Sequence, residues 1–400
     1  MIKELTLAMT SLPLGWESKE FEKCLKKVIY SKKIKRKEFL NEGLHPIISQ
    51  EKENINGYWD KSDDLFKVNK PVVIFGDHTK ILKYIDFDFV LGADGVKILL
   101  ANENINSKYL FYFLQNMDLG DLGYARHYRL LKEIQISYPK SLPQQKHIVA
   151  TLDKAFAAMD TAKANAEKNL QNAKELFESY LQNIFENKGG NWDEKTLGDE
   201  NLLKIVDGDR GKNYPVKADF KDDGYCLFMN TKNVRNDGFL FVTKMFITKE
   251  KDKSMGKGKL TRNDIVMTTR GTIGNLGVYN ENIPFDNIRI NSGMLIFRPN
   301  QKVVTSQYLF ELFRSGIMKN LIKRHVSGAA QPQLPIKTLV NFTLPIPPLN
   351  QQKQIVQKLN TLSIETKKLE AIYTQKIADL EEMKKSVLQK AFSGQLNTIN

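Results

Sequence analysis

The stretch Gln144-Gln-Lys-His-Ile-Val149 occurs a second time as Gln351-Gln-Lys-Gln-Ile-Val356, 207 residues further along the chain. Laid over each other without a gap, residues 144–187 and 351–394 agree at 12 of 44 positions, and the identities gather at the two ends. Polar residues match at the same offset as apolar ones. We therefore interpret the two segments as an internal duplication, and chance similarity between two coiled-coil segments is the alternative.

Each copy predicts one long helix, because its apolar residues recur every 3.5 to 3.6 positions over several heptads. At about 1.5 Å per residue, a helix of roughly 40 residues would be about 60 Å long. A helix with one narrow apolar stripe requires a partner, so we expect the copies to pack on each other, with Thr366 and Lys376 as polar interruptions that fix the register. The expected contact residues are Ile148, Leu152, Ala155, Met159, Ala162, Ala166, Leu170, Ala173, Phe177, Tyr180 and Ile184 in the first copy, and Ile355, Leu359, Leu362, Leu369, Tyr373, Leu380, Met383 and Val387 in the second.

The composition favours a polyanionic partner. The chain has 400 residues, with 60 Lys and Arg against 46 Asp and Glu, which gives a formal net charge of +14. An excess of this size makes nucleic acid the leading candidate. A solvated basic surface without a specific use is the alternative.

Cysteine usage and the apolar runs indicate the compartment. Cys24 and Cys226 lie far apart and show neither metal-binding nor disulfide spacing, which fits a reducing cytoplasm. Lys3 and Glu4 interrupt the N-terminal apolar stretch, so it lacks a signal-peptide core, and no run reaches the ~18 residues of a membrane span. We expect a soluble, cytoplasmic protein with no membrane partner.

The rest of the chain predicts two related globular units of mixed strands and helices, at residues 1–143 and 188–350. Residues 144–187 then form the first long helix, and residues 351–400 form the second with a C-terminal tail. Strands are expected at 71–75, 87–91, 96–100 and 134–139, and a helix at 107–115 with Ser107 as its N-cap. The second unit repeats this order, with strands at 265–271 and 293–298, and with Tyr308-Leu-Phe310 in the place of Tyr109-Leu-Phe111.

In the second unit, a glycine-rich turn and a small-residue loop are candidates for DNA contact. Arg270 and Thr272 stand in the turn Arg270-Gly-Thr-Ile-Gly274, where a guanidinium and glycine-freed amides suit phosphates or base edges. Glycines that only turn a hairpin are the alternative. Glutamine is a bidentate partner for adenine, and the following loop supplies two. The candidates from this loop and from the basic helix before it are Gln331, Gln333, Lys323 and Arg324.

Basic and amide side chains elsewhere give further candidates. The first unit offers Arg126, His127 and Arg129 in the place of the small-residue loop. Charge runs are solvated surface by default, but beside so much other positive charge they can line a phosphate track. On this reasoning we add Lys32, Lys33, Lys35, Arg36 and Gln50 in the first unit, and Arg210, Lys212, Asn230 and Lys232 in the second, with ordinary turns as the alternative.

The sequence shows no catalytic constellation. None of the five histidines lies at metal-binding spacing with another His or Cys. Nucleophile elbow, phosphate-binding loop and nuclease carboxylate cluster are all missing. We therefore expect a protein that binds rather than catalyses.

Two variable units, each followed by a Pro-rich strand, a Gln-Gln-Lys motif and a long helix, resemble the DNA-specificity subunit of type I restriction-modification enzymes. The resemblance covers nearly the whole chain. The motifs that carry it are Ser141-Leu-Pro-Gln-Gln-Lys-His-Ile148, Pro345-Ile-Pro-Pro-Leu-Asn-Gln-Gln-Lys-Gln-Ile355, the Arg270–Gly274 turn, Gly328-Ala-Ala-Gln-Pro-Gln333 and Leu388-Gln-Lys-Ala-Phe-Ser-Gly-Gln-Leu396. The first unit departs from the pattern, because it lacks both the Arg-Gly turn and the Gly-Ala-Ala-Gln-Pro loop.

The resemblance implies an α+β fold of two tandem α/β target-recognition domains, separated by two long helices packed as an antiparallel coiled coil. Each domain would read one half of an asymmetric bipartite sequence in double-stranded DNA, and the helices would fix the gap and dock the modification subunits. The implied partners are two modification subunits, which bind S-adenosylmethionine, and two restriction subunits, which use ATP and Mg²⁺. No cofactor and no catalysis would belong to this chain. A non-specific DNA-binding scaffold and a standalone DNA-modifying enzyme are the alternatives.

Overall fold

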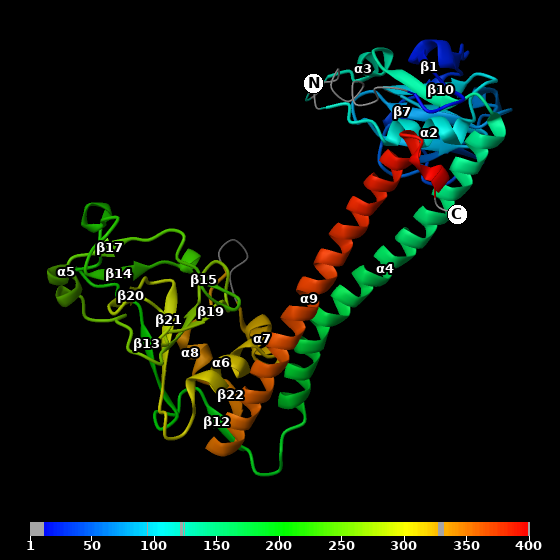
Figure 1. Ribbon diagram of the computed structural model, residues 1–400. Helices are drawn as coiled ribbons and strands as arrows, with labels where there is room; N and C mark the ends of the chain where they lie inside the picture. Colours follow the sequence, from blue (N-terminus) through cyan, green and yellow to red (C-terminus); the bar gives the residue numbers. More distant parts are fainter. Residues whose placement is uncertain (1–11, 94, 121–122, 124, 327–331, 399–400) are drawn as a thin grey trace. The chain divides into compact units, whose positions relative to one another are not determined.

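The computed structural model describes residues 12–93, 95–120, 123, 125–326 and 332–398. The chain divides into two compact units, the first formed by Met1–Glu167 with Thr374–Asn400 and the second by Lys168–Tyr373. Each unit combines small sheets and short helices with part of both long helices, α4 (Leu142–Glu186) and α9 (Leu349–Phe392). The predicted class of mixed helix and sheet with two long helices is confirmed (Figure 1).

In the first unit, helix α2 (Ser107–Gln115) packs on a four-stranded sheet, because its apolar face meets the side chains of Val73, Phe75 and Leu99. The sheet has the order β2 (Leu25–Lys26), β10 (Val96–Ala101), β7 (Val72–Gly76), β8 (Leu82–Ile85). A second sheet has the order β3 (Lys33–Ile34), β9 (Phe89–Gly92), β4 (His45–Ile48), β5 (Gly57–Trp59), with β6 (Leu65–Phe66) also on β9. The remaining elements are β1 (Trp16–Glu20), which pairs with β11 (Gln135–Pro139), α3 (Tyr128–Lys132), and the 3-10 turns η1 (Phe21–Cys24), η2 (Arg36–Glu38), η3 (Ser62–Asp64) and, at the end of the chain, η6 (Gln395–Thr398).

The second unit has the same plan, with helix α6 (Ser306–Arg314) in the place of α2. Its four-stranded sheet has the order β13 (Leu203–Asp207), β21 (Met294–Pro299), β18 (Ile265–Thr268), β19 (Leu276–Val278). Its second sheet has the order β17 (Phe246–Ile247), β14 (Cys226–Met229), β20 (Ile288–Ile290). The remaining elements are β12 (Asp193–Thr196) paired with β22 (Thr343–Ile346), β15 (Val234–Arg235) paired with β16 (Gly238–Phe239), α5 (Lys249–Ser254), α7 (Gly316–His325), α8 (Ile336–Leu339), η4 (Lys217–Asp219) and η5 (Thr231–Asn233).

Strand registers show that the duplication extends to the sheets. In both units the third strand of the four-stranded sheet is antiparallel to both neighbours. In both units the second sheet contains a parallel pair, β4 with β9 and β14 with β20. The observed strands end within two residues of the predicted ends, apart from the segment predicted at 265–271, whose last three residues lie beyond β18.

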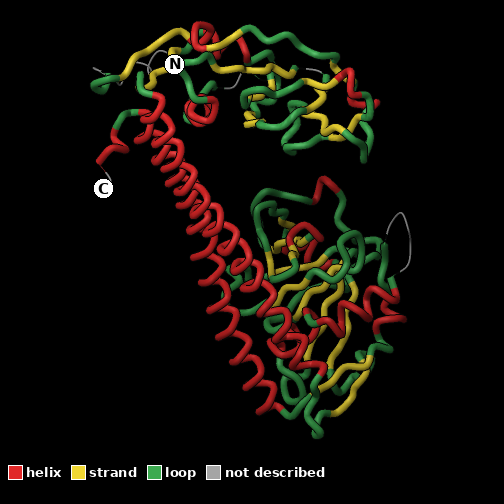
Figure 2. The backbone as a smooth tube through the Cα atoms, turned by 90° about the vertical axis from the view of Figure 1, so that its right-hand side faces the viewer, coloured by secondary structure: helices red, strands yellow, loops and turns green. Residues whose placement is uncertain are grey.

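The two long helices lie side by side and run in opposite directions (Figures 1 and 2). In the first unit the start of α4, at Ile148 and Leu152, shares a core with Leu388 and Phe392 near the end of α9. In the second unit Phe185, near the end of α4, shares a core with Leu359. The predicted antiparallel packing is thus confirmed, and both helices begin two residues before the predicted start.

Burial corrects part of the predicted contact stripe of α9. Leu369 and Met383 are 37% and 51% exposed, so these two predicted contact residues point to solvent. Lys376 is exposed as well, whereas Thr366 is buried and its hydroxyl donates to the carbonyl of Leu362. The expectations for Leu369, Lys376 and Met383 were therefore wrong. Polar residues interrupt the apolar stripe in this part of α9, so the sequence pattern did not define the contact face there.

The repeated glutamine has a structural cause. The Gln145 side chain is fully buried: its carbonyl accepts from the Asn106 N–H, and its amide donates to the carbonyls of Asn104 and Pro139. Gln352 repeats this in the second unit, accepting from the Thr305 N–H and donating to the carbonyls of Val303 and Pro347. A buried main-chain group without a partner is costly, so one amide that satisfies three of them is hard to replace.

The hydrogen bond between Gln145 and Asn106 also bears on the predicted N-cap of α2. The N-cap is Asn106, whose side chain accepts from the N–H groups of Lys108 and Tyr109, and Ser107 is the first helical residue. The prediction of Ser107 as N-cap was wrong by one position, because asparagine caps equally well and Gln145 fixes the backbone of Asn106. Thr305 caps α6 in the second unit.

Candidate nucleic-acid interface

Three segments meet just beyond the C-terminal end of β7 in the first unit and of β18 in the second. We name this region of each unit the strand-end edge. In the first unit it comprises residues 77–78, Gly95 and 126–127, since the Asp77 N–H donates to the Gly95 carbonyl (2.7 Å) and the His127 N–H to the Asp77 carbonyl (2.7 Å). In the second unit it comprises residues 269–270, Gly293 and 333–334. The Thr269 N–H donates to the Gly293 carbonyl (2.9 Å), and the Leu334 N–H donates to the Thr269 carbonyl (3.1 Å).

The second unit's edge carries the predicted glycine-rich turn. Arg270 forms an antiparallel bridge with Gln333, which brings together two residues that are far apart in sequence. Gly271 and Gly274 have φ angles of 70° and 88°, so this turn requires glycine. The Thr272 carbonyl accepts from the Thr268 hydroxyl, and its side chain is exposed. The glycines therefore do turn the hairpin between β18 and β19, and the turn displays Arg270 and Thr272 at the edge.

Other predicted residues of the second unit adjoin this edge. The Arg210 guanidinium donates to the carbonyl of Ser292 (3.1 Å), next to Gly293. A Cβ on Gly293 would lie 3.1 Å from the Thr231 side chain, so η5 with Asn230 and Lys232 lies against the same turn. The Asn230 side chain caps η5 by accepting from the Lys232 N–H, while the Lys232 side chain is exposed.

The basic end of α7 contributes in part. Lys323 lines a cavity together with Ile273 and Gly274, which places it beside the glycine-rich turn. Arg324 is exposed at the end of the helix, and Lys212 is exposed in the loop after β13. Gln331 lies outside the described residues.

The first unit's edge carries different side chains. The side-chain oxygen of Gln50 accepts from the His78 N–H (3.1 Å), and a Cβ on Gly95 would lie 2.7 Å from the same oxygen. The predicted Gln50 therefore lies at the edge. Arg126 is exposed there, whereas His127 is 1% exposed and its ring lies 3.1 Å from the Asp77 carbonyl. The structure thus gives His127 a packing role inside the edge.

Sequence reasoning missed His78. It occupies the place of Arg270. His78 follows Asp77, which bonds to Gly95, just as Arg270 follows Thr269, which bonds to Gly293. The equivalence is visible in the sequence as well, since Gly95 and Gly293 each directly precede a strand. Lys97, also missed, lies 3.9 Å from the Asp77 carboxylate and packs over the Tyr128 ring.

The basic run of the first unit is exposed and partly paired. Lys32 lies 4.0 Å from the Asp64 carboxylate, and Arg36 lies 2.7 Å from the carboxylate of Glu51, the residue after Gln50. Lys33 and Lys35 are exposed, and Arg129 is exposed on α3. Within this run, Arg36 is the residue connected to the edge, through its ion pair with Glu51.

The buried carboxylate near the second edge, that of Asp209, is bonded to the main chain. Burial raises the pKa of the Asp209 carboxyl. The backbone N–H groups of Gly211, Lys257 and Gly256 lower it by more, so the pKa lies below its ordinary value.

Across the described part of the chain, no group of three or more His, Cys, Asp or Glu residues could hold a metal ion. No helix in the same residues is both long and apolar enough to cross a membrane.

The fold defines a protein with two related units that share a pair of long helices. The family model of the type I restriction modification DNA specificity domain matches residues 13–171 and again residues 189–381. The chain therefore belongs to this family and contains two copies of its domain, as the sequence motifs predicted.

Curated relatives carry the same description. The specificity subunit of the Escherichia coli type I restriction enzyme EcoR124I/EcoR124II is 26% identical over 366 residues, which covers 87% of this chain and 85% of the relative. The specificity subunit of the E. coli enzyme EcoBI is 26% identical over 368 residues, covering 85% of this chain and 75% of the relative. These matches confirm the predicted class of specificity subunit rather than enzyme.

Solved structures share the fold. A chain from a type I R-M system superposes with a TM-score of 0.71 at 17% identity and covers 96% of this chain and 100% of that one. The HsdS subunit of Thermoanaerobacter tengcongensis gives a TM-score of 0.61 at 17% identity and covers 98% and 100%. At such identities the likeness concerns the fold alone.

Proposed function

We propose that this chain directs a type I restriction-modification complex to an asymmetric, bipartite DNA sequence, and that each strand-end edge reads one half of it. The carrying observation is that one backbone frame displays different side chains in the two units. Arg126 in the first unit occupies the place of Gln333 in the second, and His78 that of Arg270. Arginine pairs with guanine and glutamine with adenine, so the two edges suit different bases.

The remaining predicted residues support the same proposal as phosphate contacts. Contacts to the backbone fix the position of a protein on DNA, and exposed lysine and arginine side chains around a reading surface serve that purpose. The exposed candidates for such contacts are Lys32, Lys33, Lys35, Arg36 and Arg129 in the first unit, and Arg210, Lys212, Lys232, Lys323 and Arg324 in the second.

The long helices are the proposed docking surface for two modification subunits in the cytoplasm. Ile364, Leu369 and Ile372 of α9 are 57%, 37% and 58% exposed, so this part of the helix presents apolar side chains that a docked subunit would cover. S-adenosylmethionine would be bound by the modification subunits, and ATP with Mg²⁺ by two restriction subunits. The chain itself would supply the address alone.

Reconstitution tests the proposed function. Modification subunits with and without this chain are given a DNA library, and methylated positions are mapped. We expect methylation of one bipartite sequence only when the chain is present. Methylation by the purified chain alone would identify a standalone enzyme, and binding without sequence preference would identify a scaffold.

A further inference from the structure

Two glycine-containing loops of the second unit enclose a cavity of about 580 Å³. It is lined by residues 207–213, which begin at the last residue of β13, and by Ser254, Gly256 and Lys257 at and after the end of α5. Arg210, Lys212 and Lys257 supply three exposed positive charges to its rim. Because the Arg210 guanidinium also donates to Ser292, this rim, defined by Arg210, Lys212 and Lys257, adjoins the second strand-end edge.

A buried carboxylate connects the two loops. Asp209 is 6% exposed and accepts from the N–H groups of Gly211 (2.7 Å), Gly256 (2.7 Å) and Lys257 (3.2 Å). Its negative charge is therefore already engaged by main-chain donors on both sides of the cavity. The other carboxylate of the lining, Asp207, lies 3.3 Å from the Arg210 guanidinium.

A buried arginine fixes the loop of Lys257 from the other side. Arg289 is 5% exposed, and its Nε donates to the Asp252 carboxylate (2.6 Å). Its remaining nitrogens donate to the carbonyls of Lys257 (2.6 Å), Asp252 (2.7 Å) and Met255 (3.1 Å). Four bonds from one guanidinium thus hold residues 252–257, and Asp252 is also paired with Lys259.

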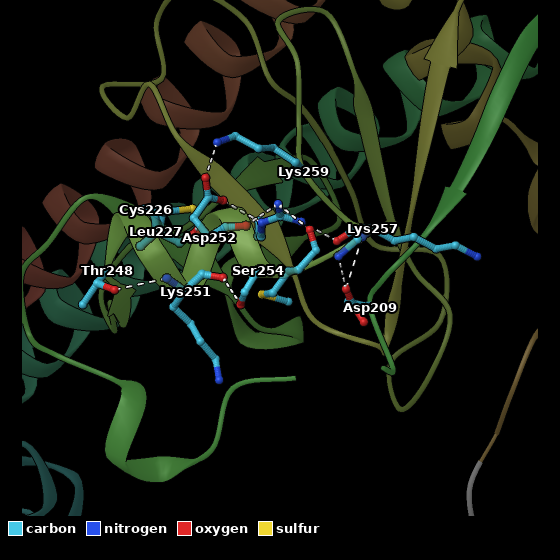
Figure 3. A network of polar contacts seen from close by, with 12 residues as sticks. Asp209, Cys226, Leu227, Thr248, Lys251, Asp252, Ser254, Lys257 and Lys259 are labelled. Atoms are coloured by element: carbon cyan, nitrogen blue, oxygen red, sulfur yellow. Dashed lines mark hydrogen bonds and ion pairs between the residues drawn. The ribbon is translucent and has the colours of Figure 1, made fainter. Parts of the chain in front are cut away.

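The backbone of Lys257 is consequently fixed at both polar groups, while its side chain is exposed. Its N–H donates to Asp209 and its carbonyl accepts from Arg289. Figure 3 shows the Lys257 backbone at Asp209, with the side chain extending away from the network around Asp252. Because the main chain of Lys257 is held at both polar groups, its side chain starts from a fixed point, which suits a contact with a ligand at a defined place.

We propose that the rim of Arg210, Lys212 and Lys257 binds a backbone phosphate of the DNA that passes the second strand-end edge, and that Arg289 is the residue that positions Lys257. This inference rests on the proposed function, since it assumes that DNA lies along that edge. A phosphate contact fixes the register of the unit on the duplex without reading a base.

The test uses the full chain in complex with its modification subunits. Fluorescent duplexes with the mapped target and with a scrambled target are titrated at several KCl concentrations. Lys257→Gln removes one charge, so affinity should fall roughly three- to tenfold for both duplexes, and the slope of log affinity against log salt should shrink by about 0.9. Lys302→Gln, an exposed lysine at the far end of β21, is the matched control and should change neither.

Positioning by Arg289 needs a separate variant. Asp252→Leu with Arg289→Met replaces the buried ion pair by apolar side chains, an exchange that often preserves stability. The carbonyls of Lys257, Asp252 and Met255 lose their donor in this variant, so its thermal unfolding should occur at a lower temperature than that of the wild type. At a temperature where it is still folded, we expect the affinity of Lys257→Gln and no further loss when Lys257→Gln is added. If the apolar pair does not fold, Arg289→Lys, which makes fewer bonds, should show a partial loss of affinity with the wild-type target preference.

The outcomes separate the two proposals. Equal wild-type affinity for both duplexes would contradict the proposed function. A wild type that prefers its target, together with a Lys257→Gln variant of unchanged affinity and salt slope, would overturn the phosphate rim alone. A well-folded Arg289 variant that binds as tightly as the wild type would overturn the positioning role.

Discussion

Val90 and Arg289 occupy the same place in the two units. Val90 faces Ile47 in the parallel pair of β9 with β4, and Arg289 faces Phe228 in the parallel pair of β20 with β14. Val90 packs in a small apolar cluster with Ile34 and Ile47, whereas Arg289 is bonded to Asp252 and to three carbonyls. Apolar packing has no direction, but a guanidinium requires acceptors at fixed places. In the second unit this interior residue thus holds the surface loop of residues 252–257 in place.

The two units agree where the long helices begin and differ at the strand-end edges. Gln145 and Gln352 make equivalent hydrogen bonds, while the strand-end edges exchange His78 for Arg270 and Arg126 for Gln333. Backbone support tolerates little change, because buried polar groups must stay paired. Exposed side chains at an edge tolerate much more. The comparison leads to predictions that can break it.

The largest effect is expected at the shared glutamines. Gln145→Leu and Gln352→Leu each leave one N–H and two carbonyls without a partner, so each should lower the free energy of unfolding by roughly 3 kcal/mol or more. Chemical denaturation measures this, with the exposed Lys146→Ala as control. A loss in one variant and wild-type stability in the other would refute the equivalence of the two positions.

A smaller effect distinguishes the units by pH. Lys83 faces Ile74 in the first unit, and Gly277 faces Val266 at the same place in the second, where a Cβ would collide with the Phe239 ring. Burial lowers the pKa of Lys83 from 10.5 to about 8. Between these values the folded state binds fewer protons than the unfolded state, so stability should rise with pH.

Relative to Lys83→Met, the wild type should therefore gain about 2 kcal/mol between pH 7 and pH 9.5. Lys83 is 5% exposed and donates to the Glu53 carbonyl and to the Asn56 side chain, so solvent screens it little. Denaturant titrations of both proteins at the two pH values give the difference. A gap between the two curves that stays constant with pH would contradict the assigned cause.

The smallest effect concerns the helices that both units share. Inserting four residues after Ala164 adds about one helical turn, or ~6 Å, and nearly preserves the apolar face. We expect unchanged half-sites and a gap longer by one or two base pairs, since DNA rises about 34 Å per turn of ~10 base pairs. Methylation mapping of the lengthened variant checks this. An active complex with the original gap would mean that the helices do not set it.

Periodicity and repetition allowed the helices to be predicted, because a stripe of apolar residues over many turns averages out single exceptions. The exceptions themselves were not predictable: Leu369 and Met383 continue the apolar pattern but lie outside the contact. The cap of α2 was misplaced by one residue because Asn106 and Ser107 both suit an N-cap, and only the distant Gln145 decides between them.

Candidate contact residues were predictable by type rather than by place. Arg270, Gln333 and Gln50 were expected from chemistry that suits base edges, and the fold brings each to a strand-end edge. His78 was missed because nothing local distinguishes it from an ordinary loop histidine. The pairing of Arg289 with Asp252 joins residues 37 positions apart, and no sequence pattern connects them.

The central claim is that equivalent edges read different halves of one target, and methylation mapping of two single variants tests it most directly. Arg126→Ala changes the first edge and Arg270→Ala the second, and each is expressed with the modification subunits. The account predicts that each variant relaxes a base in one half-site, at a cost of roughly 1–3 kcal/mol at that base, and leaves the other half-site intact. Relaxation of the same half-site by both variants, or a wild-type target in both, would contradict it.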